Sequence, residues 1–172
     1  MWLFLKNLVF TLVVPGLVVG WVPYVYLLRR PIPPALWSWT HWLALPPVLV
    51  GAAAYLACVW QFMTTGRGTP APIDPPKKLV QRGPYRWVRN PMYLALLAVV
   101  LGEVLFFRHL ALVLYFFFLA SAFQLFVVLY EEPVLRRRFG AIYSDYCNAV
   151  NRWMPGKPKP RLETVAPFNP PR

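Results

Sequence analysis

Residues 110–132 read LALVLYFFFLASAFQLFVVLYEE, and this stretch decides how the chain folds. From Leu110 to Tyr130 it carries no charged side chain. A helix needs about 20 apolar residues to cross the hydrocarbon core of a bilayer, so the stretch is long enough to span one. Glu131 and Glu132 follow directly. Because a carboxylate beside hydrocarbon is costly unless it meets a cation, the pair predicts a polar site where the helix leaves the apolar phase.

The composition of the chain is that of a membrane protein. Of its 172 residues, 58% are hydrophobic and 17% are aromatic, which lies outside the range of ordinary soluble domains. The net charge of +12 comes from basic residues that lie between and after the apolar stretches. This arrangement favours anionic membrane lipid, and not nucleic acid, as the partner. Cys58 and Cys147 form no disulfide framework, and the sequence has no spacing typical of a metal site.

Four apolar stretches predict an all-α, polytopic membrane protein with a single domain. We expect transmembrane helices at about residues 3–28, 36–62, 92–107 and 110–130. Apolar residues at helical spacing over 133–150 predict a further helix on the membrane surface, so the C-terminal region is expected to be helical as well.

Proline marks the interruptions in this pattern. Pro15, Pro23 and the pair Pro46–Pro47 lie inside the first two predicted spans, where we expect kinks. Residues 69–76 hold four prolines and predict an extended segment. Proline and basic residues also dominate the tail, residues 156–172.

The distribution of Lys and Arg predicts the orientation in the membrane. Basic residues gather in the loop 64–90 and after Tyr130, whereas the opposite loops carry only Arg29, Arg30 and Arg108. The basic side of a membrane protein faces the cytoplasm, so four spans place both termini there, together with the C-terminal helical region. The compact length and the lack of an evident organelle signal favour a bacterial inner membrane.

The shortest connection brings two polar segments together. Only Arg108 and His109 separate the third and fourth spans, which predicts a tight antiparallel hairpin. Its cytoplasmic ends then place residues 89–93 beside Glu131 and Glu132. Adjacent side chains on a helix point about 100° apart, so one carboxylate can face a ligand while the other binds an arginine.

Each of these segments also has an interpretation without a ligand. Asn90–Pro91 is typical of a helix start, with Asn as the cap and Pro in the first turn. The free N–H groups of such a turn attract anions, or the segment simply begins the span. Glu132 and Arg136 stand four residues apart in the order that favours a pair within one helix. Pro133 suits the first turn of a new helix, which predicts a junction at the carboxylates with free backbone groups.

Two motifs resemble one known superfamily. Residues 83–85 (GPY) and 89–95 (RNPMYLA) resemble the G-P-Y and R-H-P-x-Y-x-G signature of the isoprenylcysteine carboxyl methyltransferase and phospholipid methyltransferase superfamily. Glu131–Glu132 begin a second run that resembles its E-E-x-x-L, F-G-x-x-Y-x-x-Y and V-x-R-x-x-P patterns, carried here by Leu135, Phe139, Gly140, Tyr143, Tyr146, Val150, Arg152 and Pro155. The resemblance covers residues 79–155.

The resemblance implies an integral-membrane methyltransferase that uses S-adenosylmethionine, with a cofactor-site region over 79–155 and no metal. It implies a pocket formed by Tyr85, Asn90, Pro91, Tyr93, Glu131 and Glu132. The residues it places near the reacting group are Arg89 and Arg152, and Glu132 is a third catalytic candidate. Asn90 stands where the signature has His, so a role for a titrating imidazole is not available. Ala95 stands where it has Gly, which predicts a less close approach of the backbone.

The sequence leaves more than one methyl acceptor possible. Carboxyl O-methylation of an isoprenylcysteine-like amphiphile is preferred, since a carboxylate is already ionised and needs only an arginine to orient it, Arg152 or Arg89. N-methylation of a phospholipid headgroup would need a base, for which Glu131 or Glu132 is available. A non-catalytic membrane scaffold is the alternative from another class. A membrane reductase with a similar C-terminal half is disfavoured by the length of this chain.

Overall fold

The computed structural model describes residues 2–28, 39–66 and 78–157. These residues form helices and turns without a β-strand, which confirms the predicted all-α class. The elements are α1 (Trp2–Pro15), a π-helical segment η1 (Gly16–Trp21), α2 (Val22–Leu28), a 3₁₀ segment η2 (Trp39–Ala44), α3 (Leu45–Gln61), a π segment η3 (Phe62–Gly66), a 3₁₀ turn η4 (Gly83–Arg86), α4 (Pro91–Phe107), α5 (Leu110–Phe126), a π segment η5 (Val127–Glu131), α6 (Glu132–Phe139) and α7 (Ala141–Ala149).

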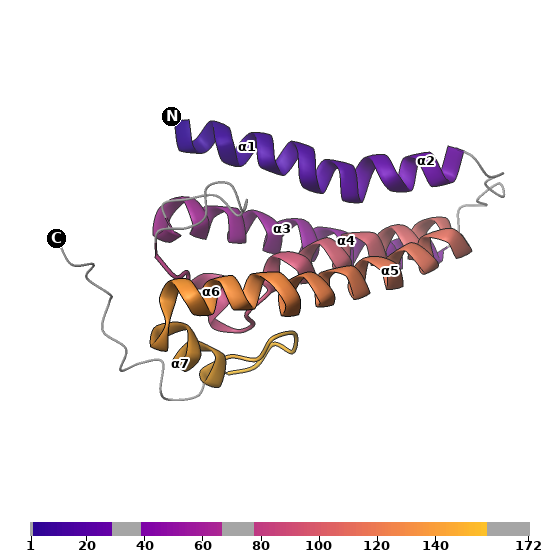
Figure 1. Ribbon diagram of the computed structural model, residues 1–172. Coiled ribbons are helices and arrows are strands. Elements are labelled where there is room, and N and C mark those ends of the chain that lie inside the picture. The colour runs from indigo at the N-terminus through magenta and orange to yellow at the C-terminus, as the bar shows by residue number, and fades with distance from the viewer. Residues whose placement is uncertain (1, 29–38, 67–77, 158–172) are drawn as a thin grey trace.

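The N-terminal helix is one continuous rod, α1–η1–α2, along one side of a bundle of α3, α4 and α5 (Figure 1). Pro15 ends α1 and Pro23 lies in the first turn of α2, so the helix geometry changes at the first of these prolines. The Tyr115 hydroxyl of α5 ties this rod to the bundle, since it donates a hydrogen bond to the Val18 carbonyl over 2.8 Å.

Pro46 and Pro47 do not interrupt the middle of a helix, as the sequence had predicted. They occupy the first turn of α3, directly after η2. In a first turn the backbone N–H has no partner within the helix, so proline loses no hydrogen bond there. The second apolar stretch is therefore a short 3₁₀ segment followed by a regular helix.

Among the described elements, α3 and α4 pack closely against each other. Both helices contribute a buried glycine to this contact, Gly51 and Gly102. A Cβ added at Gly51 would lie 2.6 Å from the Ala95 carbonyl oxygen, so the missing side chain is what lets the two backbones approach. Tyr55, Val59, Ala95 and Leu96 form the adjoining apolar core.

The predicted hairpin of α4 and α5 is confirmed. Arg108 caps α4 in the left-handed conformation, with φ of 50°, and its N–H donates to the Val104 carbonyl over 2.8 Å. His109 caps α5, since its Nδ1 accepts the Ala111 N–H over 3.2 Å. The turn is therefore closed by two local hydrogen bonds, and the other ends of both helices lie together near α6 (Figure 1).

The predicted helix over residues 133–150 is divided in two. Gly140 ends α6 with a φ of 55°, a conformation that residues with a Cβ rarely adopt. α7 turns back beneath α6, and Tyr143, Tyr146, Ala149 and Val150 form a second buried cluster. Gly140 thus folds the C-terminal region under the end of the α4–α5 hairpin that adjoins α6.

Two of the described helices are long and apolar enough to cross a membrane, His41–Gly66 and Leu110–Phe139. Shorter apolar helices cover Leu12–Val25 and Pro91–Phe107. The four-span topology therefore stays a prediction, as does the side of the membrane on which the C-terminal region lies. The extended segment predicted over 69–76, Arg29, Arg30 and most of the tail lie outside the described residues.

We expect Gly51→Ala to destabilise the protein by about 2 kcal/mol, because the new methyl group collides with the α4 backbone. Thermal unfolding in detergent measures the change. Gly16→Ala is the matched control, since a Cβ there meets nothing within 4 Å. Equal unfolding temperatures for the two variants would contradict the close α3–α4 contact.

Candidate functional site

A cavity of about 580 Å³ lies where α4 begins and η5 meets α6. One part of its wall is polar and comes from both predicted segments, and the remainder is apolar. The lining residues are Phe10, Val14, Phe62, Leu79, Val80, Tyr85, Arg89, Asn90, Tyr93, Ala122, Phe123, Phe126, Tyr130, Glu131, Val134, Leu135, Tyr143 and Tyr146. A wall of this kind suits a ligand that has both a polar and an apolar part.

The predicted convergence of the two polar segments is confirmed. The Tyr93 hydroxyl donates to Glu131 Oε2 over 2.7 Å, and Arg89 Nη1 lies 3.2 Å from Glu132 Oε1. Both contacts join the start of α4 to the end of the α5–η5 helix. The hairpin therefore brings residues 89–93 and 131–132 to a single place, as the short turn had predicted.

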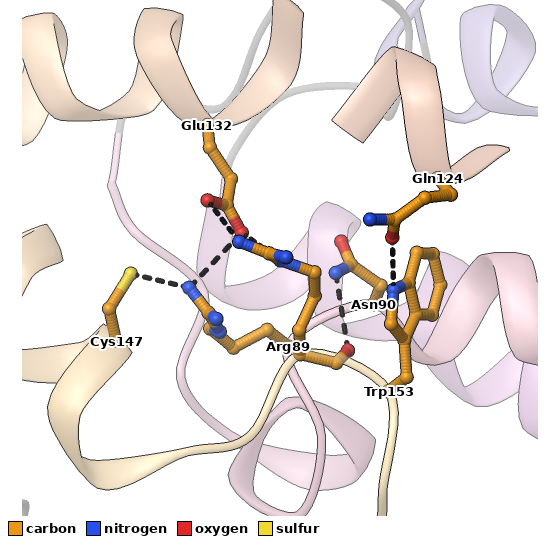
Figure 2. Close-up of polar contacts among 7 residues, drawn as sticks. Arg89, Asn90, Gln124, Glu132, Cys147 and Trp153 are labelled. Atoms are coloured by element: carbon orange, nitrogen blue, oxygen red, sulfur yellow. Dashed lines mark hydrogen bonds and ion pairs between the residues drawn. The ribbon is translucent and has the colours of Figure 1, made fainter. Parts of the chain in front are cut away.

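Glu132 is held between two arginines (Figure 2). Arg152 donates from Nε to Oε1 over 2.7 Å and from Nη2 to Oε2 over 3.0 Å, a two-pronged pair. This hydrogen bonding raises the pKa of the Arg152 guanidinium. Arg89 contacts the same carboxylate, whose side chain is only 8% exposed. Two cations balance this buried charge, which is the condition for keeping a carboxylate there.

The two adjacent carboxylates take different roles, as their angular spacing had predicted. Glu131 lines the cavity and binds Tyr93. Glu132 binds arginine and is not among the cavity-lining residues of the described chain. The predicted pair of Glu132 with Arg136 is replaced by these contacts, and the Arg136 guanidinium lies over the Tyr143 ring at 5.8 Å.

The junction predicted at Glu131–Glu132 is absent, because one helix runs from α5 through η5 into α6. Pro133 has no N–H to give to a carbonyl in the preceding turn. The chain absorbs this proline with a wider turn, in which the Glu132 N–H donates to the Val127 carbonyl. Such π turns change the direction of the side chains that follow and often occur at functional sites.

Arg89 is the arginine that reaches the cavity. Its Nη1 donates to Cys147 Sγ over 2.7 Å and also faces Glu132 (Figure 2). Its Nε is buried and has no hydrogen-bond acceptor among the described residues. A buried donor without an acceptor is costly, and the two Nη1 contacts offset part of that cost.

Asn90 precedes α4 but does not cap it through its side chain. The amide Nδ2 instead donates to the Arg152 carbonyl over 3.2 Å, which ties the C-terminal loop to the start of the helix. Pro91 is buried as the first residue of α4 and does not line the cavity among the described residues. Its part in the site is to set where the helix begins.

Two buried tyrosines complete the floor of the cavity. The Tyr146 hydroxyl donates to the Tyr85 carbonyl over 2.7 Å. Burial raises the pKa of the Tyr85 phenol well above its ordinary value, and burial likewise raises the pKa of Tyr146. Both phenols are therefore neutral at physiological pH and act as hydrogen-bonding groups, without supplying charge.

Sequence reasoning placed most of the polar wall and missed much of the apolar wall. Tyr85, Arg89, Asn90, Tyr93 and Glu131 line the cavity, whereas Pro91, Glu132 and Arg152 support it from outside. Tyr143 and Tyr146 belong to a quoted motif and could have been assigned to the site from it. Phe10 and Val14 come from the N-terminal helix, where no motif signals a ligand.

A match to one protein family covers most of the chain region that forms the cavity. The family model described as phospholipid methyltransferase matches residues 39–142, more than half of the chain. The match includes the cavity residues of α4, α5 and α6. No curated protein and no solved structure matches the chain.

We expect Glu132→Gln to destabilise the fold by about 3 kcal/mol, because Arg89 and Arg152 then lose their shared counter-charge. Thermal unfolding in detergent measures the change. Arg137→Gln, an exposed site on the same helix, is the control and should have little effect. If both variants unfold alike, the arginine pair does not stabilise the protein.

Proposed function

The chain belongs to the phospholipid methyltransferase family, and on that premise we propose that it transfers a methyl group from S-adenosylmethionine to a lipophilic acceptor at a membrane face. The family suggests a membrane methyltransferase, and the two long apolar helices agree with it. The observation that carries the proposal is the cavity, whose polar wall contains one carboxylate and one arginine beside an extended apolar wall.

The residues that line the cavity suit the proposed methyl donor. S-adenosylmethionine is cationic at its sulfonium and ammonium groups, and Glu131 supplies a carboxylate for a cation. Tyr85, Asn90 and Tyr93 offer hydroxyl and amide groups for its ribose and carboxylate. The volume of about 580 Å³ lies within the usual range for small-molecule sites.

When bound, S-adenosylmethionine supplies an electrophilic methyl group on sulfur. The part left to the protein is to position the acceptor in line with that group and to exclude water. Phe123, Phe126 and Leu135 form an apolar wall next to Glu131, which keeps water out of the polar part. Tyr93 holds the Glu131 carboxylate in place by a 2.7 Å hydrogen bond.

We favour a carboxylate as the acceptor group, as in an isoprenylcysteine-like amphiphile. Such an acceptor is ionised already and needs orientation, not a base. Arg89 suits that task because its side chain lines the cavity and brings a positive charge to the wall. Arg152 is occupied by Glu132 in a two-pronged pair, so its part is to position Glu132 and Arg89.

A second candidate reaction is N-methylation of a phospholipid headgroup, which the description of the matching family favours. An amine must lose a proton before it attacks, and a carboxylate within the cavity is needed as the base. Glu131 is the lining residue that meets this need. Glu132 is engaged by two arginines and is less suited to accept a proton.

The acceptor chain is proposed to remain in the lipid while its head enters the cavity. Phe10 and Val14 of α1 and Phe126 of α5 give the apolar wall for this passage. We further propose the four-span topology with both termini in the cytoplasm, in a bacterial inner membrane, from the distribution of basic residues.

We expect Glu131→Gln to weaken binding of S-adenosylmethionine by about tenfold or more, because the cation loses its counter-charge in the cavity. Calorimetry on protein in detergent measures the affinity. Asp145→Asn, an exposed carboxylate on α7, is the control. Unchanged affinity in Glu131→Gln would contradict the proposed pocket.

The acceptor is identified by incubating the protein and a membrane extract with radiolabelled S-adenosylmethionine. We expect label in the lipid fraction that base releases as volatile methanol, since an ester is labile to base. Label that resists base and travels with phosphatidylethanolamine derivatives would favour the second candidate. Absence of transfer to any lipid fraction would favour the scaffold.

A further inference from the structure

The chain between α7 and the tail forms a closed loop, residues 151–156, which we name the C-terminal loop. Its two ends are pinned to the same short segment before α4. The Arg89 N–H donates to the Asn151 carbonyl over 2.9 Å, and the Gly156 N–H donates to the Trp87 carbonyl over 3.0 Å. With both ends held at one place, the middle of the loop has to project away from it.

The tip of the loop contacts α5 at Gln124, a polar residue in an apolar stretch of that helix. Trp153 Nε1 donates to Gln124 Oε1 over 2.6 Å (Figure 2). Gln124 is the one side-chain amide within the apolar run of α5, seven residues before Glu131. At about 1.5 Å per residue, the contact lies about 10 Å along the helix from the carboxylates, on their apolar side. Figure 1 shows the yellow loop running from α7 along α5.

The tip of the loop and α5 both carry exposed apolar side chains. Met154 is 76% exposed, and Leu125 and Phe118 of α5 are 58% and 68% exposed. The tip residues Trp153, Met154 and Pro155 carry no charge. In lipid an amide oxygen without a donor is costly, whereas in water the solvent supplies one. The indole N–H of Trp153 supplies a donor to Gln124 Oε1.

The loop also supports the cavity. The centroid of the Trp153 ring lies 6.4 Å from that of the Tyr93 ring, and the Tyr93 hydroxyl binds Glu131. Arg152, the first residue of the loop after Asn151, clamps Glu132. Movement of the loop would therefore release both the apolar support of Tyr93 and the arginine contact of Glu132.

From these contacts we propose that the C-terminal loop is a re-entrant clasp, whose tip enters the hydrocarbon of the bilayer beside α5 and is fastened there by the Trp153–Gln124 bond. Its partner is the acyl-chain region of the membrane. The proposal rests on the membrane placement of α5 and not on methyl transfer. At this depth the bond favours a single position of the loop, because any other position leaves the Gln124 amide oxygen without a hydrogen-bond donor.

The depth of the tip is measured with a nitroxide at Met154→Cys, in a background of Cys58→Ala and Cys147→Ser, after reconstitution in phosphatidylglycerol–phosphatidylethanolamine vesicles. We expect greater accessibility to oxygen than to a water-soluble nickel chelate. Leu125→Cys and Asp145→Cys, both exposed, report α5 and the aqueous side. A Met154 label that behaves like the Asp145 label, while the Leu125 label lies in lipid, overturns the proposal.

The bond is tested in the same labelled protein. Trp153→Phe keeps a ring but leaves the Gln124 amide unpaired, and we expect a more mobile label with roughly tenfold greater access to nickel. Adding Gln124→Leu removes the unpaired group and should restore the original spectrum. If Trp153→Phe gives the same spectrum with and without Gln124→Leu, the tip of the loop does not lie in hydrocarbon, since in water the freed amide binds solvent. Neither measurement needs a methyl donor, so the position of the loop can be determined even if the protein does not transfer methyl groups.

Discussion

The structure around the cavity depends on one buried carboxylate, Glu132, held between Arg89 and Arg152. These three residues come from the turn before α4, from α6 and from the C-terminal loop. A buried carboxylate without cations would be costly, and two arginines without it would repel each other. The charges therefore force three segments that are distant in the chain to meet at one place, and the cavity lies beside that meeting point.

Holding Glu132 leaves its neighbour free for a ligand. Glu131 points into the cavity, where Tyr93 is its partner. The wide π turn before Pro133 sets the direction of both side chains without breaking the helix. One adjacent pair of identical residues thus divides into a structural carboxylate and a cavity-facing carboxylate, and the difference arises from helix geometry and from which of them meets arginine.

The same arrangement gives the cavity a polar part and an apolar part. The cavity wall is polar where α4 begins and apolar where α5 and the N-terminal helix line it. Among the described residues, Arg89 both binds Glu132 and lines the cavity. Its buried Nε has no hydrogen-bond acceptor among those residues. A ligand with a polar head and an apolar body would meet both parts of this wall, and the chain belongs to the phospholipid methyltransferase family.

The helical class, the hairpin at Arg108–His109 and the meeting of its two polar segments could be predicted from the residues alone. The length of the apolar stretches and the two-residue connection leave few other ways to fold. The sequence did not reveal the continuous helix through Glu131–Glu132, since a proline after a carboxylate is equally typical of a new helix. Which carboxylate binds arginine, and that Trp153 reaches Gln124, became known from the folded structure. Those contacts join residues 20 or more positions apart, and the spacing of neighbouring residues in the sequence cannot predict pairs so far apart.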